Sequence, residues 1–174
     1  MKAMLRCMKY IVDRPNCGLV LQPDVLYYDD PKTSFIVSNR TDSDYAKGPI
    51  TRRSVSGGRV MLNGVPVKFR SSMQKTVALL VMETELYAAV MTAQDVLYVL
   101  HVLESIGLQA QLPMILEVDN KGTMDLENIW SVGGQTRNID VHQTFLHELK
   151  EEGKLLVKWL PGKDNVADMF TNKS

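Results

Sequence analysis

Two strand-like runs of residues, 57–62 and 65–70, flank the dipeptide Asn63-Gly64. An Asn-Gly pair between such runs is the strongest short-range signal for a tight β-hairpin, because both residues tolerate the positive φ angles of the turn. A third strand-like run, 34–42, precedes them. The sequence therefore predicts three consecutive antiparallel strands, and this prediction constrains the fold more than any other feature of the chain.

Beyond the hairpin, helical and strand-like patterns alternate. Strands that are reached through helices run parallel to a neighbour, whereas hairpin partners run antiparallel. The sequence therefore predicts the α/β class, with a mixed five-stranded sheet flanked by helices. The remaining predicted elements are helix 76–106 (ended by Gly107), strand 114–119, helices 121–130 and 139–152, strand 154–160 and helix 166–170.

The N-terminal region differs from the rest. Apolar residues at positions 4, 5, 8, 11 and 12 fall on one face of a helix, which Pro15 and Gly18 end. A short extended piece and a polar stretch with two prolines follow. We therefore predict an N-terminal helix and linker at 1–33 and a main domain at 34–174.

Composition excludes several classes of protein. The chain has 174 residues, 45% of them apolar, which suits one domain with a core of its own. Cys7 and Cys17 form no CxxC pair, which argues against a disulfide framework or a zinc ribbon and favours a reducing compartment.

No signal-peptide pattern is visible at the N-terminus. The apolar segment 76–103 is long enough to span a bilayer, but Glu83, Glu85 and Asp95 interrupt it, so a buried helix is expected. Both observations favour a cytoplasmic or nuclear protein without a transmembrane segment.

Two aspartates end predicted strands. Asp42 and Asp119 would emerge at the same edge of the sheet if their strands are parallel neighbours, and open α/β sheets bind ligands at that edge. Close carboxylates repel each other, and divalent cations with oxygen ligands remove that repulsion. Two such metals about 4 Å apart can activate water against a phosphodiester. Taken singly, an aspartate at a strand end is more often a turn residue or a helix cap.

A series of short blocks resembles the ribonuclease H domain of copia-type retrotransposon polyproteins. The blocks are TDSDYA, RRSVSGG, LNGVPV, QKTVAL, METELYAAV, LEVDNKG, TRNIDV, FLHELKEEG and DNVADMFT, in the family's order over residues 35–171. Residues 2–19 resemble the segment that joins reverse transcriptase to this domain. The resemblance implies a ribonuclease H-like sheet and cleavage of the RNA strand of RNA/DNA hybrids. It also implies the reverse transcriptase region of the same polyprotein as a partner.

The family's metal site has four carboxylates that hold two Mg²⁺ ions, for which Mn²⁺ can substitute. By the matching blocks, these are Asp42, Glu85, Asp119 and Asp168. Asp44 is an alternative to Asp42, since residues i and i+2 share a strand face. Glu83 lies about 200° from Glu85 on a helix, so only one of them can face the metals. Periodicity does not choose between them, and the ELYAA match favours Glu85.

The chain departs from the family at several positions. Asn138 stands where the family usually has a histidine, and an asparagine cannot carry a proton in catalysis or product release. Tyr45 replaces the usual tryptophan, and Gln143-Thr144 replaces the usual Tyr-His. None of these changes removes a predicted metal ligand.

Basic residues are concentrated between Tyr45 and Met82, where there is no acidic residue. They are Lys47, Arg52, Arg53, Arg59, Lys68, Arg70 and Lys75. Such side chains can bind nucleic-acid phosphates, or they can simply form a solvated hairpin face. The predicted nucleic-acid contacts are Arg52, Arg53, Lys75, Asn120 and Arg137, with helix capping the alternative for Asn120. Tyr45 is expected at the surface, where it could stack on a base, and Trp159 in the core.

Two other functions fit the pattern less well. A remnant of a transposon could keep the fold and bind nucleic acid without cutting it. An integrase-like nuclease shares the strand order but would usually carry three acids.

Overall fold

In the part of the chain that the structure describes, the predicted strands and helices follow one another in the predicted order. The structure is a computed structural model that describes residues 2–16, 21–23, 34–46, 51–75, 77–78, 80–120, 137–162, 165, 167, 170 and 171. Its elements are α1 (Lys2–Asp13), β1 (Ser34–Phe35), β2 (Val37–Asp44), β3 (Val55–Leu62), β4 (Val65–Met73), α2 (Val81–Ser105), β5 (Gln109–Ala110), β6 (Met114–Val118), α4 (Arg137–Glu151) and β7 (Leu155–Trp159).

The main sheet is mixed, as predicted. β2, β3 and β4 pair antiparallel, whereas β6 joins β2 and β7 joins β6 in parallel, which gives the order β4-β3-β2-β6-β7. The hairpin turn has φ angles of 47° at Asn63 and 80° at Gly64. The Asn63 side chain also accepts a hydrogen bond from the backbone N–H of Ile36 at 2.8 Å, which ties the turn to the start of β2.

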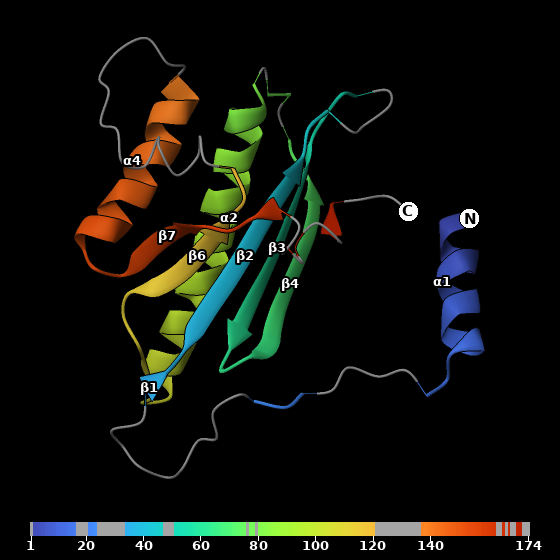
Figure 1. Ribbon diagram of the computed structural model, residues 1–174, viewed down its shortest axis with the longest axis horizontal. Helices are drawn as coiled ribbons and strands as arrows, with labels where there is room; N and C mark the ends of the chain where they lie inside the picture. The colour runs from blue at the N-terminus through green and yellow to red at the C-terminus, as the bar shows by residue number, and fades with distance from the viewer. Residues whose placement is uncertain are drawn as a thin grey trace.

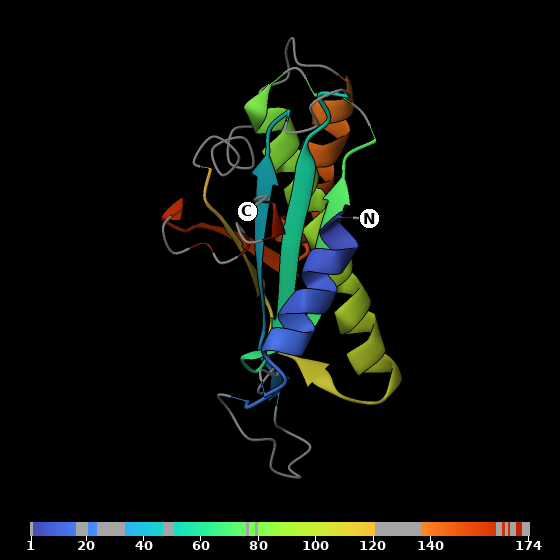
Figure 2. The ribbon, with the colours of Figure 1, turned by 90° about the vertical axis from the view of Figure 1, so that its right-hand side faces the viewer.

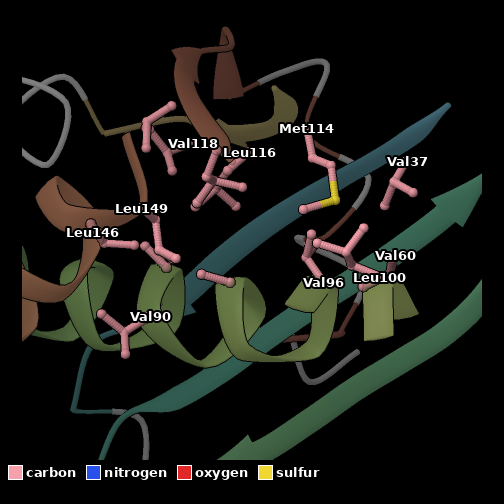
Figure 3. Packing of buried hydrophobic residues seen from close by; sticks show 14 of the residues in the cluster. Val37, Val60, Val90, Val96, Leu100, Met114, Leu116, Val118, Leu146 and Leu149 are labelled. Atoms are coloured by element: carbon pink, nitrogen blue, oxygen red, sulfur yellow. The ribbon is translucent and has the colours of Figure 1, made fainter. Parts of the chain in front are cut away.

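Two helices cover one face of this sheet. α2 crosses behind the strands in Figure 1 and packs on β2 and β3, while α4 packs beside it on α2 and β7. The apolar core lies between these helices and the sheet (Figure 3). Leu116 on β6 is 0% exposed and Leu86 on α2 is 1% exposed, so the sheet and the long helix each bury a leucine almost completely in this core.

Truncation of Leu116 to alanine is expected to lower the free energy of unfolding by about 2–5 kcal/mol, because it removes buried methyl groups and leaves a cavity. Urea denaturation followed by circular dichroism measures the change. The matched control is Leu5→Ala in α1, where the leucine is 58% exposed and little change is expected. Equal losses in the two variants would contradict the assigned core.

α2 is long and apolar enough to cross a membrane by length and composition alone, but 56% of its most apolar window is buried inside the protein. The buried aspartate of α2 is also paired with cations inside the protein. Asp95 is 4% exposed and accepts hydrogen bonds from Arg70 at 2.6 and 2.5 Å, and Lys68 lies 2.8 Å away. Burial alone would raise the pKa of Asp95, but these two cations hold it below its usual value. The expected buried helix is thus a core helix of the domain.

The structure differs from the sequence prediction in several details. β5 was not predicted, and it pairs in parallel with β1 outside the main sheet. α2 begins at Val81, five residues later than predicted. Predicted helix 121–130 lies outside the described residues, as do most of extended piece 18–21 and part of helix 166–170.

α1 forms where predicted but stands apart from the sheet in Figure 1. It lies in front of the strands in Figure 2, which looks from the β4 side. Its apolar residues are exposed, with Ile11 at 68% and Val12 at 75%. The proposed boundary between 1–33 and 34–174 stays a prediction.

Candidate metal centre and nucleic-acid interface

The parallel pairing of β2 and β6 brings two aspartates to one edge of the sheet. Arg40 on β2 is in register with Glu117 on β6, so two residues further along each chain Asp42 and Asp119 come side by side. Asp42 is 6% exposed, and Asp119 is half-buried. This arrangement agrees with the edge predicted from the sequence.

Glu85 reaches the same place from the N-terminal part of α2. One carboxylate oxygen from each of Asp42, Glu85 and Asp119 lies within 4.8 Å of the other two. A hydrogen bond of 2.9 Å between the hydroxyls of Ser43 and Thr84 joins β2 to α2 beside them. The strand and the helix are thereby held together at the point where their carboxylates meet.

The electrostatics of Glu85 reflect this crowding. Burial, with Glu85 8% exposed, is the largest cause that raises its pKa, to about 8. A hydrogen bond with Ser43 lowers the pKa, and the charges of Asp119 and Asp42 raise it further. A divalent cation among three such oxygen donors would favour the ionised form and relieve the repulsion, since hard cations prefer carboxylate ligands. The donor set therefore fits Mg²⁺ or Mn²⁺.

The two alternative acids lie outside this cluster. Among the described residues, neither Asp44 nor Glu83 joins the three carboxylates. Asp44 is the last residue of β2, two residues beyond Asp42, and Glu83 lies about 200° from Glu85 around the axis of α2. The geometry thus favours the residues chosen by the family resemblance, while their role stays a prediction.

Asp168 lies outside the described residues, but residues on both sides of it pack on the sheet beside Asp42. The Thr171 hydroxyl donates a hydrogen bond to Asp42 Oδ2. Asn165 Nδ2 donates to the backbone oxygen of Thr41 at 3.0 Å, and Ala167 is fully buried. Thr171 was not among the predicted site residues, because nothing local in the sequence links it to Asp42, 129 residues away.

Gly57 makes this close packing possible. It is opposite Asp42 in the β2–β3 ladder, and a Cβ atom there would lie 2.8 Å from Thr171 Cγ2 and 3.1 Å from the Ala167 backbone oxygen. No larger residue fits without displacing the C-terminal segment.

We expect Gly57→Ala to lower the free energy of unfolding by about 1–3 kcal/mol, since overpacking forces the backbone to shift. Urea denaturation measures this change in the free energy of unfolding. Thr171→Val, which keeps the shape but removes the hydroxyl, separates packing from the hydrogen bond to Asp42. Unchanged stability in Gly57→Ala would refute the tight contact.

Trp159 is a correction to the sequence prediction. It was expected in the core, but it is 40% exposed at the end of β7. Its indole Nε1 donates a hydrogen bond of 3.0 Å to the backbone oxygen of Asp119, and Leu160 N donates one of 2.7 Å to Val118 O. The last residue of β7 therefore holds the backbone that carries Asp119. The alternation of buried and exposed positions along β7 did not predict this role, because Trp159 is the last residue of the strand.

Several predicted nucleic-acid contacts surround the same end of the sheet. Arg52 and Arg53 are exposed just before β3, and Lys75 is exposed just after β4. The backbone of Gln74 bonds to Ser54 at 2.8 Å, which brings these two segments together. Tyr45 is 40% exposed beyond Asp44, as expected.

Other basic residues have different surroundings. Lys68 and Arg70 pair with Asp95 on α2, so they stabilise the fold. Asn120 is half-buried after β6, and Arg137 begins α4, although its side chain lies outside the described part, as does Lys47. Asn138 is the next residue of α4.

Comparison with known sequences identifies relatives in mobile elements. No protein-family model matches the chain. It is 29% identical over 136 residues, or 78% of its length, to the retrovirus-related Pol polyprotein from transposon TNT 1-94 of Nicotiana tabacum. It is 22% identical over 98% of its length to that from transposon RE1 of Arabidopsis thaliana. The chain spans only 10–11% of the length of these relatives.

Solved structures share the fold. The N-terminal ribonuclease H domain of a Mycobacterium tuberculosis protein superposes with a TM-score of 0.57 at 14% identity, covering 80% of this chain and 92% of that one. LC11 ribonuclease H1 in complex with an RNA/DNA hybrid gives 0.54 at 13% identity, covering 78% and 94%. The chain therefore has the ribonuclease H fold, and its sequence is similar to part of the retrovirus-related Pol polyproteins of plant transposons.

Proposed function

We propose that this chain is a metal-dependent nuclease that hydrolyses the RNA strand of RNA/DNA hybrids. The single observation that carries the proposal is the meeting of Asp42, Glu85 and Asp119, with oxygens within 4.8 Å, at the C-terminal edge of parallel strands. We add Asp168 as the fourth carboxylate. Support comes from its neighbours in sequence, since Ala167 and Thr171 pack beside Asp42.

Two Mg²⁺ ions, when bound, would supply an activated water and charge stabilisation for the leaving oxygen of the phosphodiester. The protein's contribution is to hold the carboxylates in place before substrate arrives. Thr171 and Ser43 bond to Asp42 and Glu85, and Trp159 holds the Asp119 backbone. Groups fixed in this way need no reorganisation during the reaction, which is how such sites lower the barrier.

The proposed substrate is a hybrid duplex. LC11 ribonuclease H1, which shares the fold, has been solved with an RNA/DNA hybrid. In this chain Arg52, Arg53 and Lys75 are exposed near the acidic edge, where they would contact phosphates. Asn120 and Arg137 are proposed as further contacts. Recognition would depend on duplex shape and 2′-hydroxyls, not on base sequence.

The N-terminal segment 1–33 is proposed to contact the reverse transcriptase region of a polyprotein. The support is the exposed apolar face of α1, where Met4, Met8 and Ile11 are each more than half exposed. A substrate made during reverse transcription places the proposed activity in the cytoplasm or the nucleus.

The test is cleavage of a labelled RNA/DNA hybrid with Mg²⁺ or Mn²⁺, beside double-stranded DNA and double-stranded RNA of the same sequence. We expect the parent protein to cut only the RNA strand of the hybrid. Asp119→Asn should bind the hybrid without cutting it. Equal cleavage by parent and variant would refute the assigned site.

A second candidate function is nucleic-acid binding without cleavage. Asn138 favours it, because the resembling family usually has a proton-carrying histidine there. Binding of the hybrid by the parent protein, with no cleavage under either metal, would support this candidate. Asn138→His would then be the variant to examine for restored turnover.

A further inference from the structure

One row of residues across the sheet joins the edge strand β4 to the carboxylate cluster. Ser71 on β4 is opposite Gly57 on β3, and Gly57 is opposite Asp42 on β2. β4 is the outermost strand of the five-stranded sheet. Since neighbouring strands lie about 4.8 Å apart, Ser71 and Asp42 are separated by roughly 10 Å along this row.

Two consecutive residues, Phe170 and Thr171, lie along this row, and we call them the C-terminal strap. At one end, Ser71 Oγ donates a hydrogen bond of 2.6 Å to the backbone oxygen of Phe170. At the other end, the Thr171 hydroxyl donates to Asp42 Oδ2. Gly57 lies between them, and a Cβ atom there would lie 3.0 Å from Phe170 Cβ and 2.8 Å from Thr171 Cγ2. The strap therefore bridges the sheet from its edge strand to a carboxylate of the cluster.

A ring contact also holds the strap at β4. The ring centroids of Phe69 and Phe170 lie 5.4 Å apart, at an interplanar angle of 47°. Phe69 and Ser71 are two residues apart on β4, so their side chains lie on the same face of the sheet. An aromatic pair and a hydrogen bond thus hold Phe170 on β4, and with it the residue that follows.

The hydrogen bond from Thr171 restricts the carboxylate of Asp42. The terminal torsion of an aspartate has a broad energy minimum, so packing alone leaves the plane of the carboxylate poorly fixed. A donor held on Oδ2 sets this plane with respect to the oxygens of Glu85 and Asp119. Hydrogen-bond partners of metal ligands typically contribute roughly 10- to 100-fold to metal affinity or activity.

We propose that Phe69 and Ser71 are positioning residues of the metal site, which orient Asp42 through the C-terminal strap. This inference rests on the proposed nuclease function, and it adds two residues that lie two strands away from Asp42. Loss of either contact at β4 loosens Phe170, and the Thr171 hydroxyl is then held less firmly on Asp42. Metal affinity falls although every metal ligand is still present.

The test measures Mn²⁺ affinity by electron paramagnetic resonance without nucleic acid, so its result does not depend on cleavage. Thr171→Val, which removes the hydroxyl but keeps the shape, should weaken Mn²⁺ binding by roughly 10- to 100-fold. Thr171→Ser keeps the hydroxyl and should bind Mn²⁺ within a few-fold of the parent. Phe69→Ala and Ser71→Ala should each weaken binding by about 2- to 10-fold, since an aromatic pair and a hydrogen bond are of that strength.

The matched control is Val67→Ala on the same strand. Val67 is 46% exposed and Phe69 is 49% exposed, but Val67 lies further from the row that contains Asp42. Its truncation should leave Mn²⁺ binding unchanged. In a Thr171→Val background, Phe69→Ala should have no further effect, because both changes act through the same hydroxyl. Urea denaturation of the metal-free variants checks that each one is folded, and Ser71→Ala keeps the test decisive if Phe69→Ala is not.

The outcomes separate this inference from the proposed function. A parent protein that binds no Mn²⁺ would refute the metal site and the positioning role together. If the parent binds Mn²⁺, and Phe69→Ala and Ser71→Ala bind it as tightly as Val67→Ala does, the positioning role is wrong and the nuclease proposal stands. Additive effects of Phe69→Ala and Thr171→Val would also overturn the positioning role, because Phe69 would then act by another route.

Discussion

Replacing Asp42 by asparagine is expected to lower the rate of hybrid cleavage by roughly 10²- to 10³-fold or more, the range seen when a group that stabilises a transition state is lost. Asp42 is the buried member of the cluster on β2, and its oxygens approach those of both Glu85 and Asp119. Asparagine keeps the shape and the hydrogen bond from Thr171, but it removes the charge that would hold a cation. Single-turnover cleavage at saturating magnesium measures the effect.

The matched control is Asp44→Asn, two residues further along β2. It makes the same chemical change on the same strand, but Asp44 is outside the carboxylate cluster. We expect its cleavage rate to stay within a few-fold of the parent. If Asp44→Asn lost activity and Asp42→Asn kept it, the assignment of the first metal ligand would be wrong. The two variants together test whether the metal ligand is Asp42, which the family resemblance favours, or Asp44, which shares a strand face with it.

Magnesium should raise the melting temperature, and more strongly at pH 8.5 than at pH 6. A ligand that binds only the folded state stabilises it by about 2.7 kcal/mol at 100 times its Kd. For a chain of this size that is roughly 5–10 °C, at about 2–4 °C for each kcal/mol. Differential scanning fluorimetry with and without magnesium across this pH range measures the shift.

The pH dependence follows from the sign of the shift at Glu85. Its pKa in the folded protein is about 8, above the ordinary value of 4.5. The metal-free fold is therefore favoured by this group below pH 4.5, and that contribution is lost as the pH rises towards 8. A cation binds the ionised form, so magnesium must displace a proton at pH 6 and much less often at pH 8.5.

Glu85→Gln and Glu83→Gln form a matched pair for this experiment. The first should remove the fall in metal-free stability between pH 6 and 8.5 and should weaken the magnesium effect. The second should preserve both, because Glu83 lies outside the cluster. A magnesium shift that is the same at both pH values in the parent would show that Glu85 does not take part in metal binding.

The sequence by itself predicted the strands of the main sheet and which of them run antiparallel or parallel to a neighbour. The Asn63-Gly64 turn, the alternating strands and the long apolar helix are local patterns, and each reports on residues that are near one another in the chain. A strand that is reached through a helix is expected to run parallel to a neighbour, but the pairing of β6 with β2 was only a condition of the prediction, and the structure supplied it. Asp42 and Asp119 were therefore expected at one edge only if β2 and β6 are parallel neighbours, which they are in the structure.

The tertiary structure decided which charged and polar groups face one another. The spacing of apolar residues did not choose between Glu83 and Glu85 as a metal ligand. The packing of α2 on β2 is what brings Glu85 to the aspartates. The basic residues of the hairpin region looked alike in sequence, but Lys68 and Arg70 pair with Asp95, whereas Arg59 lines a cavity.

Thr171 and Trp159 also have hydrogen-bond partners that the sequence did not predict. Thr171 bonds to Asp42 across 129 residues, and Trp159 holds the Asp119 backbone across 40. Such partners are chosen by the free energy of burial and hydrogen bonding in the folded core, where each polar group must find a partner from a distant segment. The local sequence determines whether a segment prefers to form a helix or a strand. The contacts between these elements determine which residues become hydrogen-bond partners.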